Sequence, residues 1–159
     1  MIWDTPWIDY AQLLHLAVTW YLVGLIWVIQ RVAYPAMEYV DPQPERAVEA
    51  EKRHCDRIFW VVGPLMLLEG VLAGWLLIAG IKSGSWLIPG LGMLLLVLLW
   101  TSTAVIQMPM HDRLLRGPNL QLQRRLVQSN WIRTIAWTLR GILALVNRIK
   151  QRVESFACR

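Results

Sequence analysis

The chain has 159 residues, of which 56% are hydrophobic and only 17% charged, whereas soluble domains average about 25% charged. Ten tryptophans and a net charge of +5 complete an unusual composition. It excludes a disordered tail, a disulfide-stapled secreted mini-protein and an ordinary soluble enzyme, and it indicates one membrane-embedded domain over residues 1–159.

Four apolar stretches, taken in chain order, predict membrane-spanning helices. A bilayer core about 30 Å thick needs about 20 apolar residues of helix. The first three stretches are long enough and contain Glu69 as their single charged residue, and the fourth is shorter and contains Arg133 and Arg140. We therefore predict an all-α integral membrane four-helix bundle with spans at about 10–30, 58–81, 86–110 and 131–148.

Lysine and arginine are concentrated in the first and third predicted connections, whereas the second holds only Lys82. Because basic loops stay in the cytoplasm, this pattern favours the plasma (inner) membrane with the N-terminus outside. Leucines alternate with arginine and glutamine over 111–130, which predicts an amphipathic segment on the inner surface. The basic tail from Arg148 onward would lie outside or along the membrane surface. The basic residues are interpreted as loop and lipid-headgroup charges, so no nucleic-acid partner is expected.

Polar side chains from all four predicted helices fall at one depth, near the inner membrane plane. We call this level the first polar layer, and its members are Gln30, Glu51, His54, Arg57, His111, Asn130 and Arg133. Helix ends carry polar groups in any membrane protein. The distinctive feature is the combination of two histidines, a glutamate, arginines and amides.

A metal site is one interpretation of the first polar layer. Glu51 and His54 are three residues apart and share a helix face. With His111 at the same depth, they would form a three-ligand site for zinc, iron or manganese. The simpler alternative is an ion-paired helix start, with Glu51 on Arg53 or Arg57.

Two other cofactors fit the same level. His54 and His111 lie on different helices and could face each other across a haem. Met108 and Met110, next to His111, also suggest copper, because thioethers favour Cu(I).

Three ionisable residues lie deeper, inside the predicted spans. His15, Glu69 and Arg140 overlap in depth, and we call them the second polar layer. Each costs at least about 2.5 kcal/mol at the bilayer centre unless it is paired or hydrated. A Glu69–Arg140 ion pair with His15 nearby is therefore predicted. It would act either as a structural pair that fixes helix register or as a proton path or substrate pocket.

The third and fourth predicted helices carry a family resemblance. The run from Gln107 to Leu114, with Pro109 inside it, and the later Asn130-Trp131-x-Arg133-Thr134 resemble small four-helix membrane proteins related to anthrone oxygenase, which are mostly of unknown function. His111 stands where that pattern usually has asparagine. The resemblance implies a four-helix bundle and, for the few assigned members, cofactor-free oxidation of polycyclic phenols.

Three functional hypotheses follow from these layers. The first is a membrane oxidoreductase or metal/haem-binding protein, and the second is cofactor-free binding or oxidation of a hydrophobic small molecule by a histidine base. The third is a non-enzymatic subunit of a larger membrane complex or a homo-oligomer in contact with lipid. The expected catalytic residues are His111, His54 and Arg133, the metal ligands Glu51, His54 and His111, and the pocket residues Gln30, Arg57, Asn130, His15, Glu69 and Arg140.

Overall fold

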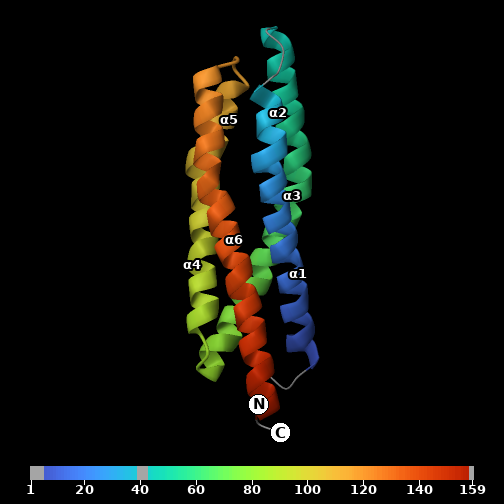
Figure 1. Ribbon diagram of the computed structural model, residues 1–159, viewed down its shortest axis with the longest axis vertical. Coiled ribbons are helices and arrows are strands. Elements are labelled where there is room, and N and C mark those ends of the chain that lie inside the picture. Colours follow the sequence, from blue (N-terminus) through green and yellow to red (C-terminus); the bar gives the residue numbers. More distant parts are fainter. Residues whose placement is uncertain (1–5, 39–42, 158–159) are drawn as a thin grey trace.

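The computed structural model describes residues 6–38 and 43–157, and these residues contain helices and turns but no strand. Four long helical rods run side by side in an elongated bundle (Figure 1), which confirms the predicted all-α four-helix architecture. The elements are α1 (Pro6–Val28), η2 (Ile29–Ala33), α2 (Tyr34–Glu38), α3 (Pro44–Ser83), α4 (Leu87–Ser102), η3 (Thr103–Gln107), α5 (Met108–Leu114) and α6 (Leu120–Ala157).

Three helical segments are long and apolar enough to cross a membrane: Trp7–Met37, Pro44–Ser83 and Leu87–Leu114. The first joins α1, η2 and α2 into one rod, and the third does the same for α4, η3 and α5. Helix α6 is long enough, but it contains no stretch as apolar as those of the other three rods. It packs along both α1 and α4. By length and composition, the first three rods are therefore suited to crossing a membrane.

Helix α6 is polar on its inward face and apolar on its outward face. The buried side chains include Asn130, Arg133, Thr134 and Arg140. The exposed ones include Ile132, Ile135, Leu139, Ile142 and Val146. Arg133 and Arg140, the two charges in the middle of α6, therefore point into the bundle, and the apolar surface that this stretch presents outward is suited to lipid.

The two longest helices exceed their predicted spans. With 40 residues in α3 and 38 in α6, each is roughly twice as long as a bilayer core of about 30 Å. The amphipathic segment expected on the inner membrane surface, residues 111–130, is divided among α5, a turn at 115–119 and the beginning of α6. The Asn119 side chain accepts a hydrogen bond from the Leu122 backbone N–H at 2.9 Å, and Leu126 is buried in the core. The Asn119 cap fixes where α6 begins, and the buried Leu126 holds its first turns against the bundle.

The tail from Arg148 onward, expected outside or along the membrane surface, forms the C-terminal part of α6. It continues as helix to Ala157. The Arg148 guanidinium donates to the Asp9 carboxylate and, at 2.6 Å, to the Gln12 side-chain oxygen of α1. This ion pair holds the end of α6 against the beginning of α1.

Two short π-helical segments interrupt the first and third rods, and a proline explains each. In η2 the Tyr34 N–H bonds to the Ile29 carbonyl, and in η3 the Met108 N–H bonds to the Thr103 carbonyl. Pro35 and Pro109 follow directly, and a proline ring clashes with the carbonyl four residues earlier in an ordinary α-helix. That carbonyl lies at the middle of each π segment, where the wider turn makes room for the ring.

Candidate functional site

The two π segments lead directly into the first polar layer. Gln30 lies within η2 and Tyr34 follows it, while Gln107 ends η3 and His111 lies one turn further on. Gln30, Tyr34 and Gln107 are all buried. Because π turns inside α-helices frequently occur at functional sites, this end of the bundle is the strongest candidate.

Glu51, Cys55 and His111 form a compact donor cluster. The His111 Nδ1 atom contacts the Glu51 Oε1 atom, and the Cys55 thiol donates to the same oxygen at 3.6 Å. One ligand atom from each residue lies within 4.8 Å of the other two. Glu51 is 4% exposed. Two residues one turn apart on α3 thus meet a histidine sixty residues further along, on α5.

His54, the third predicted ligand, lies beside this cluster. Its ring stacks on that of His111 with centroids 6.0 Å apart, and Tyr34 completes a triangle at 5.8 Å from His54 and 6.3 Å from His111. The Tyr34 hydroxyl is 3.5 Å from His111 Nε2. The structure therefore brings together Glu51 and His111 as expected, but it adds Cys55 as the third donor and places His54 in a ring contact.

A hydrogen-bonded network of amides lies against the same layer. The Gln30 side-chain oxygen accepts from the Asn130 amide at 2.8 Å and from the Thr134 hydroxyl at 3.4 Å. Arg133 donates to the Asn130 side-chain oxygen at 3.1 Å. The Arg133 Nε atom is buried, and within the described ranges it has no hydrogen-bond partner. Arg133 is thus a largely buried cation with donor capacity to spare.

Arg57 lies apart from the buried layer. It is exposed and lines a groove of about 480 Å³ with Leu25, Ala50, Arg53, His54, Ile58 and Val61. Depth alone suggested that Arg57 joins the layer, but its position around α3 turns it outward. The groove reaches the layer through His54, which belongs to both.

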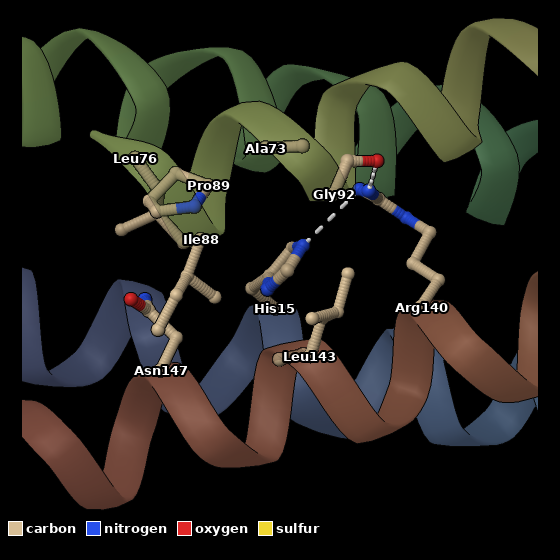
Figure 2. A pocket seen from close by; sticks show the side chains of 10 residues that line it. His15, Ala73, Leu76, Ile88, Pro89, Gly92, Arg140, Leu143 and Asn147 are labelled. Carbon is tan, nitrogen blue, oxygen red and sulfur yellow. Dashed lines mark hydrogen bonds between the residues drawn. The ribbon is translucent and has the colours of Figure 1, made fainter.

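The second polar layer joins all four long helices. Arg140 of α6 donates from Nε to the Glu69 carboxylate of α3 at 2.6 Å, and its Nη1 donates to the Gly92 carbonyl of α4. From α1, the His15 ring nitrogen is 3.2 Å from the same carboxylate. The predicted Glu69–Arg140 pair with His15 beside it is present (Figure 2 draws His15, Gly92 and Arg140).

Thr19 and Gly92 complete the second polar layer. The Thr19 hydroxyl is 3.2 Å from the Glu69 carboxylate and also donates to the His15 carbonyl at 2.7 Å. A Cβ at position 92 would lie 3.2 Å from Arg140 Nη1. The pattern of polar side chains in the sequence does not reveal a backbone acceptor such as the Gly92 carbonyl. The signal that could have found it is a glycine at the same depth as Arg140 on a neighbouring helix.

Comparisons with protein-family models, with curated proteins and with solved structures find no match. The candidate function therefore depends on the geometry of the two layers.

Proposed function

We propose that this chain is an integral membrane metalloprotein in which Glu51, Cys55 and His111 hold one transition-metal ion. The observation that carries the proposal is their set of three donor atoms, all within 4.8 Å, from two helices far apart in sequence. Thiolate, imidazole and carboxylate together suit Zn²⁺ or Fe²⁺, and three protein ligands leave a position for water or substrate.

Tyr34 supports the histidine in the role of a ligand. A metal bound at His111 Nδ1 leaves the Nε2–H free to donate, and the Tyr34 hydroxyl lies 3.5 Å away. Metal-binding histidines usually donate this second N–H to a fixed acceptor, which sets the tautomer and the ring orientation. Tyr34 is 2% exposed, so its position is fixed by packing.

The three-ring contact favours a single ion over haem. Tyr34 lies within 5.8 Å and 6.3 Å of the two histidine rings by centroid distance. A porphyrin between His54 and His111 needs a flat open slot, which the Tyr34 ring narrows.

The groove beside His54 fits a hydrophobic small molecule that enters from the membrane. Its volume of about 480 Å³ falls within the range of ligand pockets, roughly 300–1,000 Å³. Leu25, Ile58 and Val61 offer apolar contacts, while Arg53 and Arg57 offer charge to an acidic or phenolic end. The distribution of lysine and arginine further supports placement in the plasma (inner) membrane with the N-terminus outside.

Elemental analysis of the full chain, purified from membranes in mild detergent, tests the metal site. We expect about one metal ion per chain, with large losses in Glu51→Gln, Cys55→Ser and His111→Ala. Asp56→Asn, an exposed acidic position on the same turn of α3, is the matched control and should keep the metal. Bound iron would support an oxidoreductase, and bound zinc would indicate Lewis-acid chemistry instead. Wild-type protein without metal above background would refute the metal site.

A cofactor-free site is the second candidate, and the direct His111–Glu51 contact favours it. A carboxylate on Nδ1 fixes the imidazole so that Nε2 can act as a general base. The anthrone oxygenase resemblance supplies the substrate class, a polycyclic phenol. Metal-free protein should then bind such a phenol, as measured by tryptophan quenching, and His111→Ala should lose the binding. Equal binding by wild type and His111→Ala would exclude this candidate.

A further inference from the structure

The second polar layer lies apart from the proposed metal site. Glu69 follows Glu51 by 18 residues on α3, a helical rise of about 27 Å. The side chains of Glu69 and Arg140 are 0% and 2% exposed. An ion pair that only holds helices together requires neither a neighbouring histidine nor a neighbouring cavity. This layer has a histidine, His15, and a cavity beside it.

One nitrogen of His15 faces two partners with opposite demands. The Nε2 atom is 3.2 Å from the Glu69 carboxylate and 3.4 Å from Arg140 Nη2. With a hydrogen on Nε2, the ring donates to Glu69 and cannot accept from Arg140. Without that hydrogen, the ring accepts from Arg140 and turns a lone pair toward Glu69. When the neutral ring carries its hydrogen on Nδ1, gaining a proton at Nε2 therefore exchanges the hydrogen bond from Arg140 for one to Glu69 in nearly the same geometry.

The Glu69 carboxylate also has acceptor capacity that the protein leaves unused. Its Oε1 atom is the one that faces His15, Thr19 and Arg140. Its Oε2 atom is buried and lacks a hydrogen-bond partner among the described residues. A buried acceptor of this kind destabilises the fold unless water or a proton satisfies it.

A small cavity extends from this cluster toward the first turn of α4, at one end of the bundle. Its volume of about 30 Å³ holds roughly two waters. Figure 2 shows His15 and Arg140 on one side and Ile88, Pro89 and Asn147 further along. Ile88 and Pro89 lie in the first turn of α4, directly after the turn at 84–86. His15 therefore faces a space that leads toward this end of the bundle.

We propose that the second polar layer is a proton-binding site, in which His15 exchanges a proton with water in the cavity. The proton leaves a hydronium ion and joins His15 Nε2, so one O–H bond breaks and one N–H bond forms. The Nε2–H then donates to Glu69 Oε1, and the hydrogen bond from Arg140 Nη2 is released. No electron is transferred, and the net charge of the cluster rises by one.

Every helix packed around His15 presents a group that affects how readily the ring gains a proton. Glu69 of α3 favours the added proton and Arg140 of α6 opposes it, while α4 presents the uncharged Gly92 carbonyl. The one acidic residue that α1 contributes, Asp9, is engaged by Arg148. The protonation state of His15 is therefore set by two nearby charges of opposite sign.

Histidine-selective ¹⁵N labelling of the full chain in lipid nanodiscs tests the proposal. The chain has three histidines, and His15→Gln identifies the signals of His15. As the sample is taken reversibly from about pH 8 to pH 5, we expect the His15 signals to change from those of a neutral ring to those of a doubly protonated ring. In Glu69→Gln, the ratio of protonated to neutral ring at a fixed pH should fall at least about tenfold.

Controls separate this behaviour from general effects of charge and packing. Glu49→Gln removes an exposed carboxylate from the same helix and should leave the ratio unchanged. Ala144→Phe fills the cavity and should abolish the water-exchange signal of the His15 ring, whereas Leu145→Phe on the outer face should preserve it. Constant His15 signals across the pH range in wild-type protein would overturn the proposal. An unchanged ratio in Glu69→Gln would also overturn it.

Discussion

Replacing Arg140 by methionine measures how strongly charge pairing holds the second polar layer. Methionine keeps most of the aliphatic stem of arginine, so the change removes charge and hydrogen bonds more than packing. The lost bonds include the one from Arg140 Nε to Glu69 at 2.6 Å and the one to the Gly92 carbonyl. Glu69 stays at 0% exposure without its strongest partner.

The structure sets the expected magnitude. Removing one partner of a buried ion pair costs about 3–5 kcal/mol, because the other charge remains uncompensated. The Thr19 hydroxyl and the His15 ring remain 3.2 Å from the carboxylate. We therefore expect Arg140→Met to lower the free energy of unfolding by about 3 kcal/mol, at the lower end of that range. The double variant Glu69→Leu/Arg140→Met removes both charges and should remain within about 1 kcal/mol of wild type.

Unfolding in mixed micelles with increasing SDS, followed by tryptophan fluorescence, gives these free energies. Trp137 is 2% exposed and serves as a reporter of the core. The single variants Arg140→Met and Glu69→Leu complete a double-mutant cycle with the pair. A cost below about 1 kcal/mol for Arg140→Met, or a double variant that loses the full sum of both singles, would refute the argument from buried charge.

Three other changes test the geometry at single positions. Pro109→Ala removes the ring clash, so η3 should become regular α-helix and α5 should rotate by about 100° about its axis. This rotation moves His111 away from Glu51 and Cys55, so the bound metal should be lost. The helix content measured by circular dichroism should stay unchanged. Gly92→Ala places a Cβ 3.2 Å from Arg140 Nη1 and should lower the SDS midpoint, whereas Gly24→Ala, with no atom within 4 Å, should not; equal midpoints would contradict the close approach. Asn130→Leu leaves buried polar partners unpaired and should cost about 1–3 kcal/mol in the same assay, and a neutral result would mean that this network is not tight.

Counting residues along the helices predicted depth well. Depth placed Glu51 level with His111 and Glu69 level with Arg140, and both pairs are in contact. This works because each residue adds a fixed rise along the helix axis. Ionisable groups in a span also need partners, which limits the choices further.

Rotation about the helix axis could not be predicted in the same way. Cys55 and His54 both lie about one turn from Glu51, and sequence spacing does not show which of them faces His111. Arg57 lies at the depth of the first polar layer, but its side chain points away from the core of the bundle. The π segments add a further change of direction that no α-helical count includes, although Pro35 and Pro109 mark where they occur.

The π segments also determine how the chain would respond to a change in its length. A π turn holds one residue more than an α turn, so each interrupted rod contains one surplus residue. In a regular helix, a one-residue deletion rotates everything beyond it by about 100° and exchanges lipid-facing for core-facing side chains. A deletion within 29–33 or 103–107, made together with replacement of the following proline, would instead leave the flanking helices facing as they do now. These two segments are therefore the places where a rod can lose one residue while each helix keeps the same face toward the core.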